Sequence, residues 1–323
     1  MVKDKILIIG TRPPPIGGVT IHVERLLGIL HKRSFPVRFL PMNIKKVFFA
    51  NFFRDLVWCD VIHLHTSNPY VRLIASMFCR LLGIRLISTI HGSLGRFRGL
   101  RNWADLKSVK WTESPLVLNK QSFEIACRLN RNSRLISAFL PPTEEKTLPT
   151  RIVEEILELK SRYMRVWSTN AYNLSFDVEG REIYGISDLI ELFLENSNLG
   201  LTISDPTGNY LKYLNSLQIE IPKNVLFITG EHSFYEVMKL TDGMIRNTTT
   251  DGDALSVKEA LYLGKHALVT DVVSRPKGAV CYTTAQDLSL LLKLEELPPL
   301  GETGILSGET ELLELYDNCV KFL

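Results

Sequence analysis

A polar loop with two carboxylates is the strongest candidate for chemistry in this 323-residue chain. The loop leaves an apolar strand pattern and enters a helical one at Ser256, and it reads Arg246-Asn247-Thr248-Thr249-Thr250-Asp251-Gly252-Asp253-Ala254-Leu255-Ser256-Val257-Lys258-Glu259. Backbone N–H groups at a helix N-terminus attract anions, and carboxylates accept hydrogen bonds from hydroxyl groups. The spacing therefore favours a sugar nucleotide whose diphosphate faces the loop amides of Asp253, Ala254, Leu255 and Ser256.

Two other interpretations of this loop stay open. Ser256 and Glu259 have the spacing of a capping box, in which Glu259 would only satisfy the backbone of the helix. Asp251-Gly252-Asp253 also has the form of the metal-binding Asp-x-Asp motif of some sugar transferases. The position of the motif, three-quarters along the chain, argues against that metal site.

Two basic residues flank the loop. Arg246 ends a strand pattern five residues before Asp251, so its side chain is expected at the same edge of the sheet. Lys258 is expected in the first helical turn, where a cation is unfavourable unless an anion is bound there. Both positions suit a diphosphate. The alternative is a local ion pair between Arg246 and Asp251 or Asp253.

A second glycine-containing loop, Gly10–Val19, joins the first predicted strand to the first predicted helix. It lacks the Gly-x-Gly-x-x-Gly pattern of dinucleotide sites, since three prolines fill the turn. Gly17 and Gly18 still let the backbone approach an anion at the helix N-terminus. The alternative is a plain entry turn in which Thr20 is the N-cap.

Three histidines end neighbouring strand patterns. His63 and His65 are two residues apart and share one face of a strand, and His91 ends the next strand before Gly92. A metal would need a third ligand, and no Cys, Asp or Glu has suitable spacing, so we expect no metal ion. We expect His65 and His91 to face a cleft between two domains, although a lone histidine at a strand end is usually structural.

These loops are positioned by alternating strand and helix patterns. Strands are predicted at 6–9, 61–65, 85–90, 115–118, 165–168, 199–204, 225–229, 243–246 and 266–270, with helical patterns at 19–31, 69–82, 121–129, 187–195, 209–217, 235–240, 257–263 and 309–323. Such alternation favours doubly wound parallel sheets, in which ligands bind beyond the carboxyl ends of the strands. Three prolines within 141–149 indicate a linker. We therefore expect an α/β chain with two Rossmann-like domains, 1–148 and 149–305, and a closing helix, 306–323.

The charge of the chain is unevenly distributed. Residues 1–150 carry a net charge of +14 and the remainder −11. The basic half indicates an anionic partner, and two of its segments, 44–54 and 96–103, mix aromatic and basic residues in a way that suits an anionic membrane surface. Residues 45–54 are expected to form a helix that lies in the bilayer interface. The alternative is that the four phenylalanines of the first segment are core. No aromatic–basic nucleic-acid module is present, and the acidic half would repel a strand, so nucleic acid is excluded as a partner.

Two further features bear on localisation. No uncharged apolar stretch is long enough to span a bilayer, and no signal peptide precedes the first strand. The five cysteines are scattered, which is typical of reduced, buried thiols. We expect a cytoplasmic protein, with a peripheral position on the inner face of the cell membrane where the basic segments make contact.

With these motifs in place, the chain resembles the GT-B family 4 glycosyltransferases along nearly its whole length. Gly17-Gly18-Val19 is similar to the first glycine loop of that family, Asp60–His65 to its second-strand segment and Thr89-Ile90-His91-Gly92 to its histidine segment. Asp251 and Glu259 match its Glu-x7-Glu motif, with Asp in place of the first Glu.

The resemblance implies retaining transfer from a nucleotide-diphosphate sugar held mainly by the C-terminal domain, without a divalent metal or other cofactor. Acceptors would bind mainly on the N-terminal domain, where His65 and Arg96 are candidates. In the donor site, Asp251 would hold sugar hydroxyls, Glu259 the ribose, and His91 would orient the sugar.

One departure from the family remains. Many relatives carry an Arg and a Lys-Gly pair that hold the donor phosphates, whereas this chain has Thr169-Asn170 and Tyr184-Gly185 there. Arg181, Arg246 or Lys258 could compensate. The leading hypothesis is a glycosyltransferase that extends a glycan, carried on a lipid diphosphate, in surface-polysaccharide synthesis. The alternative is a non-catalytic GT-B scaffold or partner subunit.

Overall fold

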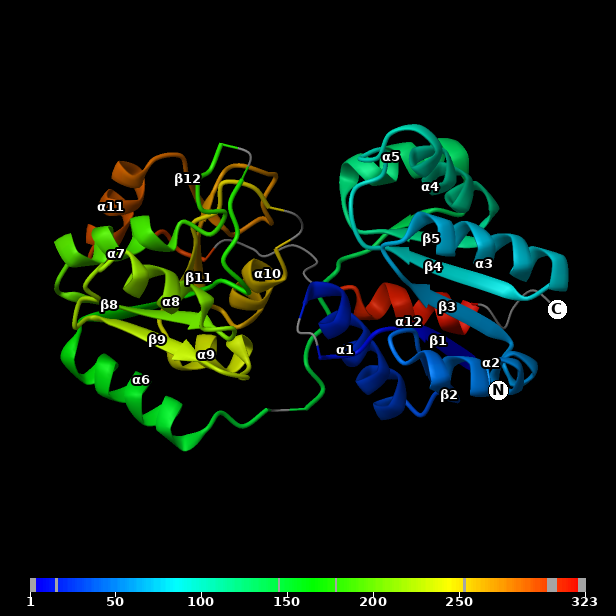
Figure 1. Cartoon of the computed structure of the whole chain (residues 1–323), viewed down its shortest axis with the longest axis horizontal. Coiled ribbons are helices and arrows are strands. Elements are labelled where there is room, and N and C mark those ends of the chain that lie inside the picture. Colours follow the sequence, from blue (N-terminus) through cyan, green and yellow to red (C-terminus); the bar gives the residue numbers. More distant parts are fainter. Residues whose placement is uncertain are drawn as a thin grey trace. The chain divides into compact units, whose positions relative to one another are not determined.

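The computed structural model describes residues 4–14, 17–144, 146–177, 179–251, 254–300 and 307–318. The chain forms two compact units (Figure 1). Unit 1 comprises Met1–Glu144 and Ser307–Leu323, and unit 2 comprises Glu145–Leu306. The sequence interpretation divides the chain at 148/149 and 305/306, within a few residues of these unit boundaries.

Unit 1 is built on a six-stranded sheet in the order β2-β1-β3-β4-β5-β6, and all its pairs are parallel. Its elements are β1 (Ile6–Gly10), α1 (Gly18–Lys32), β2 (Val37–Pro41), α2 (Lys45–Trp58), β3 (Val61–His65), α3 (Pro69–Leu82), β4 (Arg85–Ile90), α4 (Gly99–Trp111), β5 (Ser114–Val117), α5 (Lys120–Leu129), β6 (Arg134–Leu135) and α12 (Glu309–Asn318).

Strand β1 shows why the apolar runs are unbroken. Successive side chains of a strand point to opposite faces, so both faces of a buried strand need apolar residues. Ile6 and Ile8 pack into the cluster formed with α1 and α12, whereas Leu7 and Ile9 pack into the cluster formed with α2 and α3. Helices therefore cover both faces of this sheet.

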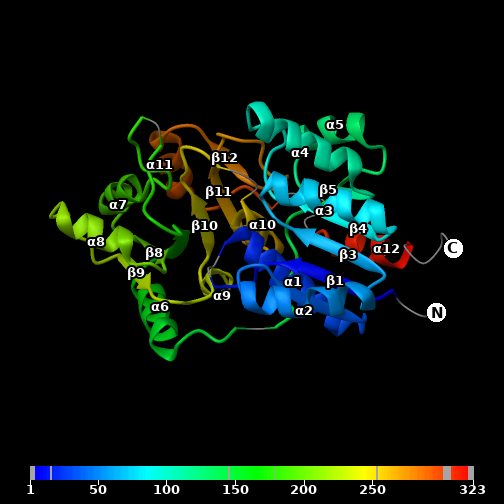
Figure 2. The same cartoon turned by 45° about the vertical axis from the view of Figure 1, so that its right-hand side comes forward.

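The C-terminal helix α12 belongs to unit 1, although the preceding chain belongs to unit 2 (Figure 2). Leu312, Leu315 and Tyr316 are buried in the same cluster as α1. Gly308 enters so close to the backbone of Ser137 that a Cβ atom at this position would lie 2.5 Å from the Ser137 carbonyl oxygen. This return of the chain to the first sheet confirms the expected closing helix.

Unit 2 repeats the architecture with the strand order β12-β11-β10-β7-β8-β9, again with parallel pairs. Its elements are α6 (Thr150–Arg162), β7 (Arg165–Asn170), α7 (Ile186–Glu195), β8 (Leu199–Asp205), α8 (Asn209–Ser216), β9 (Val225–Thr229), α9 (Phe234–Leu240), β10 (Gly243–Arg246), α10 (Leu255–Tyr262), β11 (His266–Thr270), β12 (Val280–Tyr282) and α11 (Ala285–Lys293).

Trp167 of β7 lies at the centre of the main apolar cluster of unit 2, fully buried. It is also the reason for glycine at the start of β10, because a Cβ on Gly243 would lie 2.5 Å from the indole ring. β10 pairs with β7 in parallel, with Gly243 opposite Trp167, so the carboxyl ends of these two strands lie side by side.

The α/β class, the two doubly wound parallel sheets and the returning helix are as the sequence predicts. The sequence interpretation did not include several elements, namely β2, α4, β6, α6, β12 and α11. In the described part of the chain, no helix is long and apolar enough to cross a bilayer. The expectation of buried thiols holds for Cys79 alone among the four described cysteines, and Cys281 is exposed.

Candidate functional site

The carboxyl ends of three adjacent strands meet at one edge of the unit 2 sheet. Asn170 ends β7, Arg246 ends β10 and Thr270 ends β11, and these strands are neighbours in the order β11-β10-β7. The loop between β10 and α10 follows directly. The structure thus places the predicted polar loop where ligands bind in doubly wound sheets.

Asp251 of this loop lies between two guanidinium groups. Arg246 donates from Nε and Nη2 to the two carboxylate oxygens, each at 3.1 Å, and Arg275 donates from Nη1 at 2.8 Å. Burial works to raise the pKa of Asp251, but the hydrogen bonds and charges of the two arginines outweigh it and hold the pKa below its usual value. The local ion pair between Arg246 and Asp251, which the sequence left open, is therefore present.

Arg275 is the residue that sequence reasoning missed. It follows β11, 24 positions after Asp251, and its side chain is only 3% exposed. Besides Asp251, its Nε donates to the Thr270 carbonyl oxygen at 2.7 Å and its Nη2 to the Thr270 hydroxyl at 3.1 Å. No motif or spacing marks this position, because only the pairing of β10 with β11 brings it to the loop.

Arg246 also lies near Asn170 and Tyr184, the two residues that the sequence analysis compared with basic residues of the resembled family. Its Nη1 lies 3.5 Å from Oδ1 of Asn170, and its guanidinium lies 5.2 Å from the ring centroid of Tyr184. The glycine after this tyrosine is needed, because Gly185 has φ +52° and a Cβ there would clash with the side-chain amide of Asn247. The guanidinium of Arg246 therefore lies near both Asn170 and Tyr184.

Arg181, which the sequence analysis also considered as a replacement for the missing phosphate-binding residues, does not contact Arg246, Asp251 or Arg275 in the described contacts. It pairs with Asp177 at 2.9 Å and Glu179 at 3.0 Å on an exposed turn. The N-terminus of α7 is satisfied by another acid, because Glu182 accepts from the backbone of Ile186 at 2.9 Å and of Ser187 at 3.1 Å.

Helix α10 begins one residue earlier than predicted. Ala254 is its N-cap and no side-chain hydrogen bond caps it, so Ser256 is the second helical residue and Glu259 the fifth. The capping box is therefore wrong, since that motif needs Ser256 at the N-cap. Glu259 is buried, at 6% exposure, and Lys258 is half-buried. Gly252 and Asp253 lie outside the described residues, and with them the proposed role of Asp253.

Unit 1 brings the predicted histidines together with a fourth. His65 Nδ1 lies 3.1 Å from His91 Nε2, and the ring of His22 on α1 packs against both, with centroids 5.4 and 5.3 Å away. The ring of His63 is 4.1 Å from that of His65. Sequence reasoning missed His22, since it follows a helical and not a strand pattern.

Burial keeps this histidine cluster (His22, His63, His65 and His91) neutral. Loss of solvent lowers the pKa of His22 to about 4, and it lowers the pKa values of the other three well below their usual value. His63 is hydrogen-bonded on both ring nitrogens, to Tyr316 and to Thr89. Among the described residues, no group of three or more His, Cys, Asp or Glu side chains is arranged to hold a metal ion.

The N-terminus of α1, which follows the glycine loop of unit 1, is capped by a different residue from the one expected. Gly17 is the N-cap of α1 and Thr20 is its third residue, where the threonine hydroxyl accepts from Gly17 N and donates to Gly17 O, both at 3.0 Å. The expectation of Thr20 as N-cap is wrong because the helix starts three residues earlier. Gly18 is the first helical residue, and a Cβ there would meet no atom within 4 Å.

The basic segment 96–103 forms the entry to α4. The Arg96 guanidinium lies so close against Gly92 that a Cβ at that position would clash with it. The ring of Phe97 lies near two guanidiniums, at 4.6 Å from Arg96 and 3.9 Å from Arg101. The one acid of α4, Asp105, is buried in an ion pair with Arg72.

The segment 44–54 divides its aromatic residues between two environments. Phe48 and Phe52 pack against the sheet, whereas Phe49 and Phe53 are 73% and 74% exposed. Exposed apolar residues continue on the neighbouring α3, which contacts α2 through Phe52 and Phe78. They are Tyr70, Ile74, Met77, Leu81 and Leu82. The core interpretation of the phenylalanines thus holds for two of the four.

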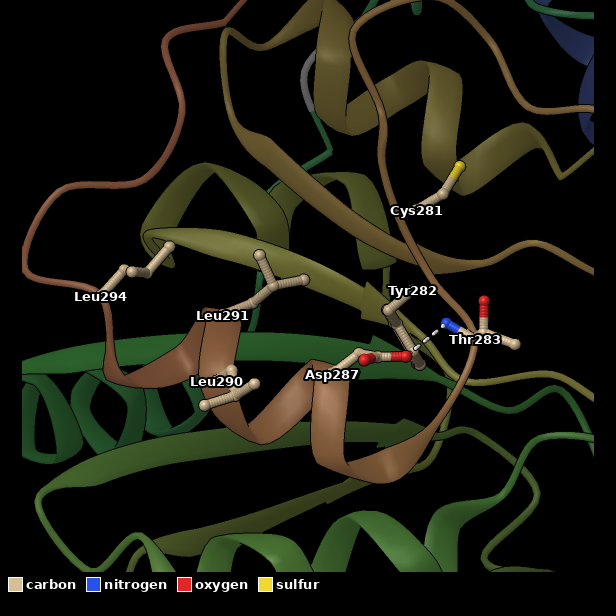
Figure 3. Close-up of a pocket in the computed structure, with 7 residues that line it drawn as sticks. All are labelled: Cys281, Tyr282, Thr283, Asp287, Leu290, Leu291 and Leu294. Atoms are coloured by element: carbon tan, nitrogen blue, oxygen red, sulfur yellow. Dashed lines mark hydrogen bonds between the residues drawn. The ribbon is translucent and has the colours of Figure 1, made fainter.

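A hollow of about 350 Å³ lies elsewhere in unit 2, between β12 and α11 (Figure 3). Its lining residues are Cys281, Tyr282, Thr283, Asp287, Leu290, Leu291 and Leu294. None of these seven is basic, and the Asp287 carboxylate already accepts from the backbone of Thr283 and Thr284. This lining does not suit an anionic ligand.

Known structures share this architecture. Sucrose-phosphate synthase from Thermosynechococcus elongatus is 12% identical, with a TM-score of 0.67 and 98% of this chain and 99% of that chain covered. HepE from Anabaena in complex with UDP is 13% identical, with a TM-score of 0.62 and coverages of 98% and 90%. A putative UDP-N-acetylglucosamine 2-epimerase from Listeria monocytogenes is 13% identical, with a TM-score of 0.62 and coverages of 100% and 98%.

By sequence, no family model and no curated protein matches the chain. At such low identity the likeness establishes the fold and not the activity. The two doubly wound sheets and the returning helix, together with these neighbours, show that this chain has the GT-B fold.

Proposed function

We propose that the protein is a glycosyltransferase that takes its sugar from a nucleotide-diphosphate donor bound at the carboxyl edge of the unit 2 sheet. The observation that carries the proposal is the pair of guanidiniums, Arg246 and Arg275, held around Asp251 at this edge. GT-B neighbours that contain UDP or UDP-glucose support it. Arginine forks suit phosphate oxygens, and this edge is the usual ligand position of the fold.

Several of the predicted residues have a role in this proposal. Arg246 and Lys258 contact the diphosphate, and the first amides of α10 face it. The family resemblance assigns Gly17 and Gly18 to donor binding as well. Oriented amides and cations stabilise the charge that develops on the leaving diphosphate, and such electrostatic stabilisation lowers the barrier more than any other single effect in many enzymes. Glu259 binds the ribose and His91 orients the sugar, as the family resemblance implies. No metal ion or cofactor is required in this scheme.

The acceptor side is proposed for unit 1. Residues 1–150, which include most of unit 1, carry a net charge of +14, and Arg96 and Arg101 both lie over the ring of Phe97, six residues after His91 in the chain. An anionic glycan carrier, such as a lipid diphosphate, fits this charge. The resemblance to family 4 implies retaining transfer and a place in surface-polysaccharide synthesis. Lys45, Lys46 and the exposed Phe49 and Phe53 would bring the enzyme to an anionic inner membrane face.

The test is binding and turnover with defined nucleotides. The purified chain is titrated with UDP, GDP, UDP-glucose and GDP-mannose while thermal unfolding is followed. The correct nucleotide at about 100 times its Kd stabilises the folded protein by about 2.7 kcal/mol. Arg246→Ala should weaken nucleotide binding by about 1.5–3 kcal/mol and leave the free nucleoside unaffected, because only the nucleotide has phosphates to lose.

The products separate the candidate activities. Sugar transferred to a lipid-linked acceptor supports the proposal. Nucleotide binding without any turnover favours the non-catalytic scaffold. Conversion of UDP-N-acetylglucosamine to its 2-epimer favours an epimerase, the activity named for two of the structural neighbours. Absence of nucleotide binding contradicts the proposal.

A further inference from the structure

We infer that Arg275 supplies the surplus positive charge that lets the Asp251 site attract a diphosphate, and that Asp251 acts through the arginines and not on the sugar. This inference rests on the proposed function and deepens it. Arg275 is thus a positioning and charge-setting residue behind Arg246.

The charges of the three side chains give the first argument. Arg246 and Asp251 alone would cancel, and a neutral pair attracts an anion weakly. Arg275 adds a second guanidinium on the same carboxylate, at 2.8 Å, so the three groups together carry one surplus positive charge. At the low exposure of these side chains, 12%, 6% and 3%, solvent screens that charge far less than at the surface.

The order of burial gives the second argument. Arg275 is the most enclosed of the three, and the backbone and hydroxyl of Thr270 fix it to the end of β11. Arg246 is the most exposed, with its Nη1 toward Asn170. Arg275 therefore fixes the Asp251 carboxylate from its more buried side. Asp251 in turn fixes the guanidinium of Arg246, the more exposed of the two arginines.

The hydrogen bonds of Asp251 give the third argument. One carboxylate oxygen accepts from Arg246 Nη2, and the other accepts from Arg246 Nε, Arg275 Nη1 and, at 3.4 Å, the Thr248 hydroxyl. A carboxylate engaged in this way has little capacity left for sugar hydroxyls. Its contribution is to position two arginines, which differs from the sugar contact implied by the family resemblance.

The experiment measures binding of inorganic pyrophosphate, UDP, GDP and their glucose or mannose derivatives by calorimetry at two salt concentrations. Arg275→Gln should weaken all phosphate-bearing probes on the order of tenfold, equally for nucleotide and nucleotide sugar, and reduce the salt dependence of binding. Arg275→Lys keeps the charge and should retain most of the affinity. The double variant D251N/R275Q regains one surplus positive charge, and the amide oxygen at position 251 still accepts from Arg246, so this variant should bind more tightly than Arg275→Gln alone.

Arg181→Gln is the matched control, because it removes one positive charge from an exposed turn of the same unit. It should leave every affinity unchanged. Wild-type binding that Arg275→Gln does not alter, or a Lys variant as weak as the Gln variant, overturns the inference. So does a double variant no better than Arg275→Gln, or a loss confined to the sugar-bearing probes. A wild-type protein that binds none of the probes contradicts the proposed function itself, together with the inference that depends on it.

Discussion

The hydroxyl group of Tyr316 on α12 is hydrogen-bonded to Nδ1 of His63 on β3, which lies 253 residues earlier in the chain. Both side chains are buried, at 2% and 0% exposure. Nε2 of the same imidazole pairs with the Thr89 hydroxyl at 2.8 Å. The returning helix is thus joined to the first sheet by a polar contact in addition to apolar packing.

Removing this hydroxyl should destabilise unit 1. Tyr316→Phe leaves a buried ring nitrogen of His63 without its partner, which costs about 1–3 kcal/mol of unfolding free energy. Urea denaturation followed by fluorescence measures this change. Tyr70→Phe, at an exposed site on α3, is the matched control and should have no effect. Equal stability of the two variants would show that the contact contributes nothing.

The histidine cluster should make unit 1 sensitive to acid. Because burial lowers the pKa of His22 to about 4, its neutral form is favoured in the folded state. Its contribution to stability is therefore complete above the unfolded pKa of about 6.5 and is lost as the pH falls toward 4. At pH 5 this one residue should cost about 2 kcal/mol relative to pH 7.5. Protonation of His63, His65 and His91 should cost more.

Denaturation midpoints at pH 7.5, 6 and 5 measure this loss. His22→Gln should flatten the pH dependence, because glutamine retains a polar side chain but does not titrate. A slope in His22→Gln equal to that of the wild type would mean that His22 does not titrate on unfolding in this range.

Glu259 should act on the donor and not on the helix. Since α10 starts at Leu255 with Ala254 as its cap, Glu259 is not part of a capping box. Glu259→Gln should therefore leave the stability near that of the wild type, but weaken nucleotide binding by about 1.5–3 kcal/mol through loss of a charge-assisted hydrogen bond. Calorimetry with the nucleotide and with its free nucleoside checks this, and the loss should appear in both because both contain the ribose.

Glu158 provides the matched control for the Glu259→Gln variant. Glu158→Gln changes an exposed residue of α6 that pairs along its own helix with Arg162. It should affect neither stability nor binding. If Glu259→Gln retains full nucleotide affinity and turnover, the assignment of Glu259 to the ribose is wrong.

The basic residues of α2 should determine attachment to membranes. Replacing Lys45, Lys46 and Arg54 with Gln removes three exposed cations beside Phe49 and Phe53. At about 1 kcal/mol for each basic residue near an anionic surface, the affinity for anionic liposomes should drop on the order of a hundredfold. Donor nucleotide binding should remain unchanged. Sedimentation with liposomes of anionic and of neutral lipids measures the effect.

The control for this triple variant removes the same charge from unit 2. Lys212, Lys223 and Lys293 are exposed there, and their replacement with Gln should leave sedimentation unchanged. Unaltered liposome binding by the α2 variant would refute membrane attachment through this helix. Equal losses in both variants would indicate that only net charge matters.

Much of the fold can be predicted from the sequence, because buried strands and amphipathic helices each have a characteristic spacing of apolar residues. β1, with apolar residues on both faces, and the helical spacing of α1 are examples. The loop from Arg246 to Glu259 could likewise be found as a candidate site, since strand, polar loop and helix follow one another locally. Elements with weak periodicity, such as β6 with two residues, were not predicted.

What only the tertiary structure decided is which distant residues share one environment. Arg275 reaches Asp251 because β10 pairs with β11, and His22 joins three histidines because α1 packs on the first sheet. Neither contact can be recognised in the sequence. An ion pair or a ring contact requires two side chains to lie within a few ångströms of each other, but it requires no particular spacing along the chain. The start of α10 at Leu255 was decided in the same way, because a helix end depends on the backbone conformation that the surrounding packing imposes.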